Sequence, residues 1–179
     1  DSAKLLRDVG LPLLFRAGFD HQKLTGFDTD SWAILTHTMD SVSAMIDDAE
    51  FQLAFCHEGG LARAIAVRNA LQSMATVVAP EVEVVEPPSF APPPVLSHDG
   101  RRMSIQEAAT IQASSSAFAD WLRGILVLII GNRDALPAIV DGGGASVLID
   151  VLGDGQDDTR QGALQALIKL SASRHLCEK

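Results

Sequence analysis

Apolar residues recur at helical spacing through the C-terminal part of the chain. Residues 158–171 place them three, four and seven positions apart, which is the pattern of an amphipathic helix. The apolar positions of this segment are Ala163, Leu164, Ala166, Leu167, Ile168 and Leu170. Two shorter apolar segments lie on either side of three consecutive glycines at 142–144. The sequence therefore predicts a unit of three helices over 133–140, 145–152 and 158–171.

A similar arrangement recurs towards the N-terminus. A polar or acidic residue, a glycine and an apolar run follow one another around Gly10, Gly60 and Gly144, which are 50 and 84 residues apart. Further helices are predicted over 3–9, 11–17, 30–46 and 61–77. Such recurrence is typical of repeat proteins, in which each unit buries its apolar faces only by stacking on its neighbours.

A proline-rich and acidic segment, residues 79–103, interrupts the pattern. Its prolines and glutamates are Pro80, Pro87, Pro88, Pro92, Pro93, Pro94, Glu81, Glu83 and Glu86. This composition predicts an insertion that forms a flexible or polyproline-like loop. It divides the chain into helical repeats over 1–78 and 104–179, and it accounts for the longer spacing between glycines. After it, two helices are predicted over 104–113 and 116–130.

The unit at 132–171 resembles an armadillo repeat. The residues that resemble its first two helices are Asn132, Arg133, Ala135, Ile139, Val140, Asp141, Gly142, Gly143, Val147, Leu148, Ile149, Val151 and Leu152. Those that resemble its third helix are Arg160, Gln161, Ala163, Leu164, Ala166, Leu167, Leu170 and Ser171. The resemblance is good over 132–177, fair over 28–76 and poor over 77–103. It implies an all-α fold, an armadillo-like right-handed superhelix of about three repeats.

Composition bears on the core and on the partners. The chain is 47% apolar but only 5% aromatic, which predicts a core of Leu, Ile, Val and Ala. The most apolar run, residues 125–130, is far shorter than a membrane span, so it is expected to be buried core. The net charge of -9 argues against a nucleic-acid partner and permits a basic peptide or protein surface.

Two alternatives would make the chain an enzyme or a ligand-binding protein. The glycines at 142–144 could hold a phosphate at a helix start, but no phosphate-loop motif accompanies them. Cys56 and His57 could form a nucleophilic pair, but adjacent helical residues point about 100° apart. Cys56 and Cys177 are expected to be buried free thiols. No enzymatic activity, cofactor or metal site is therefore predicted.

The resemblance implies a partner-binding groove lined by the third helices. The candidate contacts there are Thr36, Asp40, Trp121, Gln161, Gln165 and Lys169. The Trp–Asn pair that importin-alpha proteins use to hold a basic peptide would fall on Gln165 and Lys169, on Gly124 and Leu128, and on Asp40 and Ala44. None of these is a Trp–Asn pair, so binding of nuclear signals is not expected. Trp121, like Trp32, is expected to pack between repeats, with partner anchoring as the alternative.

The function expected from this reading is non-catalytic protein binding. The chain would be a scaffold or adaptor and a subunit of a larger hetero-complex. It would be intracellular and most simply cytoplasmic, with an organellar or ciliary complex left open. The alternative function is a chaperone cofactor, a nucleotide-exchange factor of the armadillo class acting on Hsp70.

Overall fold

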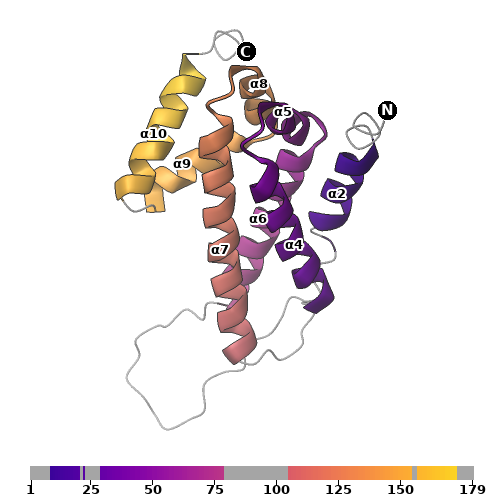
Figure 1. The fold of residues 1–179 in the computed structure, drawn as a ribbon. Helices are drawn as coiled ribbons and strands as arrows, with labels where there is room; N and C mark the ends of the chain where they lie inside the picture. Colours follow the sequence, from indigo (N-terminus) through magenta and orange to yellow (C-terminus); the bar gives the residue numbers. More distant parts are fainter. Residues whose placement is uncertain (1–8, 21, 23–28, 79–104, 155–156, 173–179) are drawn as a thin grey trace.

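The computed structural model describes residues 9–20, 22, 29–78, 105–154 and 157–172. Within these ranges all regular secondary structure is helical, which confirms the prediction of an all-α protein (Figure 1). The helices are α2 (Leu11–Gly18), α4 (Thr29–Met45), α5 (Ala49–His57), α6 (Gly60–Val78), α7 (Ile105–Ile129), the 3-10 turn η2 (Arg133–Ala135), α8 (Leu136–Asp141), α9 (Gly144–Asp154) and α10 (Asp157–Ser171). The expected helix over 3–9 and the insertion over 79–103 lie outside the described residues.

The helices pack as successive layers along the chain. Figure 1 shows α4, α7 and α10 following one another across the molecule, with α6 behind α4 and α7. Helix α2 packs on α4 and α6, α6 packs along α7, and α9 packs on α10, α6 and α7. Helices α6 and α7 flank the segment 79–104, so the chain on either side of that segment contributes to one shared core.

Two successive units of the chain begin in the same way. Asp48 precedes α5, and its carboxylate accepts a hydrogen bond of 2.8 Å from the Phe51 N–H. Asn132 precedes η2, and its side-chain oxygen accepts one of 3.2 Å from the Asp134 N–H. Both residues satisfy a backbone donor that a helix start leaves open. The Asn132 amide also donates to the Ala49 carbonyl at 3.1 Å, which joins the starts of the two units.

The turn between the first and second helices is also the same in both units. Gly59 has φ of 79° and Gly143 has φ of 83°, a left-handed conformation that L side chains rarely adopt. These two glycines are separated by the same 84 residues as Gly60 and Gly144, the landmarks recognised in the sequence. The glycine pattern therefore marks a recurring backbone turn at these two places, whereas Gly10 before α2 has φ of -67°.

The second glycine of each turn permits a close approach of two helices. A Cβ atom added to Gly60 would lie 2.5 Å from Cδ2 of Phe55, and one added to Gly144 would lie 2.6 Å from Cγ2 of Ile139. Real Cβ atoms essentially never show contacts this short. Phe55 and Ile139 are themselves 84 residues apart and fully buried, so the two units share the contact as well as the turn.

The prediction of two helices over 104–113 and 116–130 was wrong, because α7 is one continuous helix over Ile105–Ile129. The predicted gap between the two helices falls on Ser114 and Ser115. Ile111 and Phe118 are seven residues apart, so they lie on one face, and both are buried. Burial on this face outweighs the few tenths of a kcal/mol per residue that serine costs in a helix.

An aromatic cluster fills the core between α2, α5 and α7. The ring of Phe15 meets that of Phe55 edge-on with centroids 5.3 Å apart, and Phe19 lies 6.4 Å from Phe118. Phe51 joins the cluster 6.2 Å from Phe15. The expectation of a purely aliphatic core was therefore wrong at this end, where the described phenylalanines gather in one place and each contributes a large buried area.

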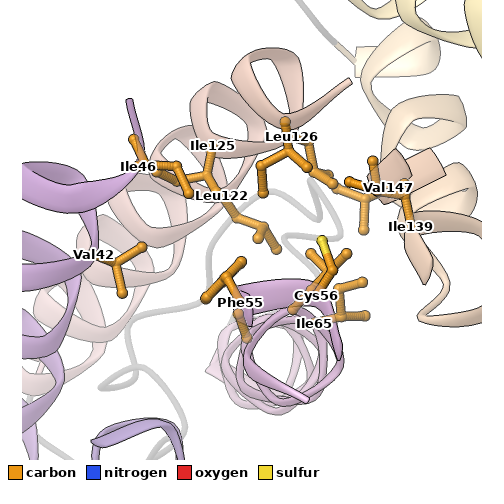
Figure 2. Close-up of a cluster of buried hydrophobic side chains, with 14 of the residues drawn as sticks. Val42, Ile46, Phe55, Cys56, Ile65, Leu122, Ile125, Leu126, Ile139 and Val147 are labelled. Carbon is orange, nitrogen blue, oxygen red and sulfur yellow. The ribbon is translucent and has the colours of Figure 1, made fainter. Parts of the chain in front are cut away.

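Further along the stack the core becomes aliphatic. Figure 2 shows side chains from α4, α5, α6, α7, α8 and α9 converging on one cluster. Those it labels are Val42, Ile46, Phe55, Cys56, Ile65, Leu122, Ile125, Leu126, Ile139 and Val147. The core continues to Leu170 of α10 without a gap between the units. The described helices therefore bury their apolar faces against one another in one core.

The glycine contacts give a test of the fold. Gly144→Ala is expected to destabilise the protein by about 1–3 kcal/mol, because its Cβ must displace Ile139 or the backbone of α8. Gly124→Ala is the matched control: Gly124 is exposed within α7 and has open space around it. This second change is expected to stabilise by up to about 1 kcal/mol. Urea unfolding of both variants measures the difference, and equal effects would contradict the proposed contact.

Candidate functional site

The six candidate contact residues lie on three helices of the structure. Thr36 and Asp40 are on α4, Trp121 is on α7, and Gln161, Gln165 and Lys169 are on α10. Five of the six are exposed, and Trp121 is half-buried. No bond between the α4 and α10 members is present among the described residues, so the candidates form two groups: one beside Trp121 and one on α10.

The first group lies at the junction of α4 and α7. The indole N–H of Trp121 donates to the hydroxyl of Ser43 on α4 at 2.9 Å. Its ring lies 5.2 Å from that of Phe118 and 5.8 Å from that of Phe19, measured between centroids. Trp121 therefore joins α4 to α7 and covers one side of the aromatic cluster.

The flank of α4 beside Trp121 carries Thr36 and Asp40. Ser43, which contacts Trp121, lies seven residues after Thr36 and three after Asp40, so all three share one side of the helix. The Thr36 hydroxyl donates to the Trp32 carbonyl of its own helix at 3.0 Å. Asp40 leaves its carboxylate exposed on this flank, which gives the flank an acidic character.

The second group is the exposed face of α10. Gln161, Gln165 and Lys169 follow one another every four residues. Leu164 and Ile168 lie beside them, with exposed fractions of 50% and 57%. The buried stripe of α10 is narrower than predicted. Of the six apolar positions, the fully buried ones are Ala163, Ala166 and Leu170.

Sequence reasoning missed Leu164 and Ile168 as functional candidates because it counted them as core. The sequence did contain a sign that these side chains are exposed. Leu164 and Ile168 are four positions apart and lie off the stripe formed by residues 163, 166 and 170. The apolar run at 125–130 was also predicted to be core, and it too is only partly buried. Its outer residues are buried as predicted, but Val127 and Leu128 are about half exposed.

Helix α10 approaches α7 at Gly162, beside the exposed Val127. A Cβ added to Gly162 of α10 would lie 3.9 Å from Cγ2 of Val127 on α7. Helix α9 adds Ile149, which is also exposed. We call Leu164, Ile168 and the polar residues Gln161, Gln165 and Lys169 the α10 face. It combines apolar side chains with neighbouring amide and ammonium groups.

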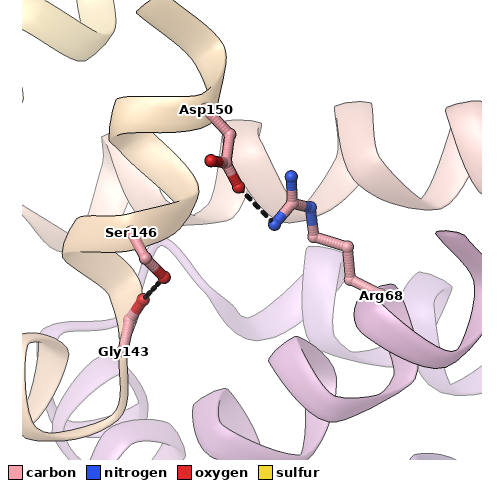
Figure 3. A network of polar contacts seen from close by, with 4 residues as sticks. All are labelled: Arg68, Gly143, Ser146 and Asp150. Carbon is pink, nitrogen blue, oxygen red and sulfur yellow. Dashed lines mark hydrogen bonds and ion pairs between the residues drawn. The ribbon is translucent and has the colours of Figure 1, made fainter. Parts of the chain in front are cut away.

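A polar cleft of about 340 Å³ lies between α6, α7 and α9. Its cations are Arg68 and Arg123, whose side chains are only 12% and 22% exposed. The Arg68 guanidinium pairs with Asp150 at 2.9 Å (Figure 3), and that of Arg123 pairs with Asp120 at 3.1 Å. Nothing in the sequence indicated this cleft, because Arg68 and Asp150 are far apart in the chain and share no motif.

Unequal helix lengths create the cleft. Helices α6 and α7 have 19 and 25 residues, whereas α9 has 11. A Cβ on Gly142, just before α9, would lie 3.6 Å from Leu61, and one on Gly144 would lie 3.2 Å from Leu126. Helix α9 thus covers the start of α6 and the end of α7, and the other halves of both helices extend past it.

The turn at 142–144 uses its own hydrogen-bonding groups. The N–H of Gly142 donates to the Ala138 carbonyl, and that of Gly143 donates to the Val140 carbonyl. The Ser146 hydroxyl donates to the Gly143 carbonyl at 2.7 Å (Figure 3). These groups are therefore not presented to a phosphate, and the glycines are explained by the turn itself.

Cys56 is buried, and burial raises the pKa of its thiol from 9.0 to about 12. His57 beside it is exposed. A thiol with this pKa stays protonated at neutral pH and is a poor nucleophile. Among the described residues, no group of three or more His, Cys, Asp or Glu side chains could hold a metal ion.

In the described ranges, no single helix is long and apolar enough to cross a membrane. One pair of helices passes that test only when taken together, with a bend of 117° between Ala109–Ile129 and Arg133–Asp141.

The buried thiol gives a second test. In a Cys177→Ser background, Cys56 should react with Ellman's reagent at pH 8 at least about a hundredfold more slowly in the folded protein than in urea. The unfolded thiol loses its proton at lower pH than the folded one, so this group makes stability decline as pH rises from 9 towards about 12. Full labelling of the folded protein within minutes would contradict the burial of Cys56.

No protein-family model, curated protein or solved structure matches the chain.

Proposed function

We propose that the chain is a non-catalytic protein-binding scaffold built of armadillo-like repeats, and that it is a subunit or adaptor in a larger assembly. The recurring cap, turn and glycine contact at an 84-residue separation support the reading as stacked repeats. In this reading α5, α6 and α7 form one repeat, and η2 with α8, α9 and α10 form the next. Helices α2 and α4 are the second and third helices of the repeat before them.

The observation that carries the proposal is the α10 face. Leu164 and Ile168 expose half or more of their surface on the third helix of the last described repeat, and amide and ammonium groups surround them. Apolar anchors within a polar rim are the usual composition of a protein-binding surface. A catalytic reading has no comparable support, since the described thiol is buried and protonated.

The chemistry of the partner follows from the same face. The partner should present an apolar surface that covers Leu164 and Ile168, with carbonyl or carboxylate groups towards Gln165 and Lys169. The acidic flank of α4 suits a basic region of the same partner. The net charge of -9 speaks against nucleic acid as that partner.

The proposal is tested by changing the α10 face. Leu164→Gln combined with Ile168→Gln should weaken binding of the partner that co-purifies with the wild-type chain by tenfold or more, as removal of interface anchors does. Leu13→Gln is the matched control, because Leu13 is an equally exposed apolar residue on α2 at the other end of the molecule. Affinities come from titration of each purified variant with the identified partner.

Circular dichroism of the variants should be unchanged, because the replaced side chains lie outside the core. Equal affinities of the α10 variant and the wild type would reject the α10 face as the binding surface. A chain that retains no partner in crosslinked cell extracts would reject the scaffold function.

A further inference from the structure

The two arginines of the polar cleft have more donors than bonds. A guanidinium carries five N–H donors, and the described contacts of the Arg68 side chain consist of its ion pair with Asp150. Arg123 has its Nε atom buried and without a hydrogen-bond partner in the described structure. A buried donor left unsatisfied costs about 1–3 kcal/mol. The Nε of Arg123 is covered by protein, so it is the other N–H groups of the two guanidinium groups, beyond those used in the ion pairs, that suit the cleft to a ligand with acceptor oxygens.

The carboxylates that pair with these arginines do not block such a ligand. The side chain of Asp150 is 51% exposed and that of Asp120 is 67% exposed. Each pair therefore joins a largely buried guanidinium group to a carboxylate that water can reach. A planar guanidinium can bind a second carboxylate in bidentate fashion with its remaining donors. An incoming carboxylate can therefore share a guanidinium group with the carboxylate that already pairs with it.

The rest of the lining favours a polypeptide. Gln72 on α6 and Gln112 on α7 bring amide groups, which both donate and accept as a peptide main chain does. Ser115 and Ser116 add hydroxyls. A nucleic acid carries many phosphates and would meet the net charge of -9, whereas screening within about 8–10 Å limits that repulsion for one or two carboxylates.

We propose that the cleft between α6, α7 and α9 binds an acidic peptide segment, with Arg68 and Arg123 holding its carboxylates. The amide groups of Gln72 and Gln112 contact the main chain of the segment. This site is separate from the α10 face, and it rests on the proposed function only in that its ligand is a segment of a protein partner. The cleft gives the chain a second contact with the partner. It prefers an acidic segment, whereas the acidic flank of α4 prefers a basic region.

The probe is a short fluorescein-labelled peptide of alternating Glu and Gly, titrated with the full chain and followed by fluorescence anisotropy. The same peptide with Gln in place of Glu should not bind. Arg68→Gln and Arg123→Gln should each weaken binding about tenfold or more, because each removes a charge-assisted bidentate contact. Arg63→Gln is the control: it removes the same charge from an exposed position of α6 outside the cleft. Equal losses of peptide affinity in all three variants would show that only the net charge of the chain matters. That outcome would overturn the proposal.

Asp150→Asn tests the site with a change that should strengthen peptide binding, whereas the arginine variants weaken it. Removing the carboxylate that occupies Arg68 should strengthen peptide binding several-fold, whereas the loss of a merely structural pair would leave binding unchanged or weaker. Should an arginine variant fail to fold, the Arg Nε–H signals of the wild-type protein give the answer in an NMR titration. The Arg123 signal is expected to shift with the Glu peptide. Its failure to move, or an equal shift with inorganic phosphate alone, would overturn the proposal.

The two proposals fail separately. The α10 variant Leu164→Gln with Ile168→Gln should bind the Glu peptide as the wild type does. If that variant keeps its partner while the arginine variants lose the peptide, the α10 face is rejected and the cleft stands. If partner binding depends on α10 but no variant or titration detects the Glu peptide, the cleft is rejected and the scaffold function stands.

Discussion

The arrangement depends on how closely the second helix of a unit approaches the end of the first. At Gly60 and Gly144 the backbone of one helix lies directly against a buried side chain of the preceding helix, Phe55 or Ile139. Any side chain at these two positions would push the helices apart. That separation sets where α6 and α9 lie, and therefore which faces α7 and α10 can bury. The glycines preceding them allow the sharp turn without strain.

The core joins units that differ in chemistry. Near α2 the contact is made by interlocking rings, and near α10 by small and branched aliphatic side chains such as Ala163 and Ala166. Aromatic rings need matched geometry, whereas small aliphatic residues allow helices to lie close together. Trp121 belongs to the first kind of contact, because its ring covers the cluster and its N–H reaches Ser43. The stack is therefore continuous in space but not uniform in composition.

Local pattern allowed the sequence to predict the helical class and most helix boundaries. The predicted helix over 158–171 differs from α10 by one residue, because its start, periodicity and end are all marked locally. Features that depend on distant segments were not predictable. The continuity of α7 follows from burial of Ile111 and Phe118 in the core, and the pairing of Arg68 with Asp150 follows from how α9 sits on α6. The exposure of Leu164 and Ile168 depends on which faces of α10 the neighbouring helices cover, and helical periodicity alone cannot decide that.

The length difference between α6–α7 and α9 has a consequence for cooperativity. Where α9 covers them, these two helices are held from an additional side, and their residues include the fully buried Leu61, Leu122 and Leu126. Among the described residues of α6, Leu71 is the last fully buried one. Past that point Ile111 of α7 is buried but fewer apolar side chains are, so this part of α6 and α7 should open before the part that α9 covers. A ligand in the cleft would bind at the boundary between the part of α6 and α7 that α9 covers and the part that it does not. Its binding would then be coupled to ordering of the uncovered part.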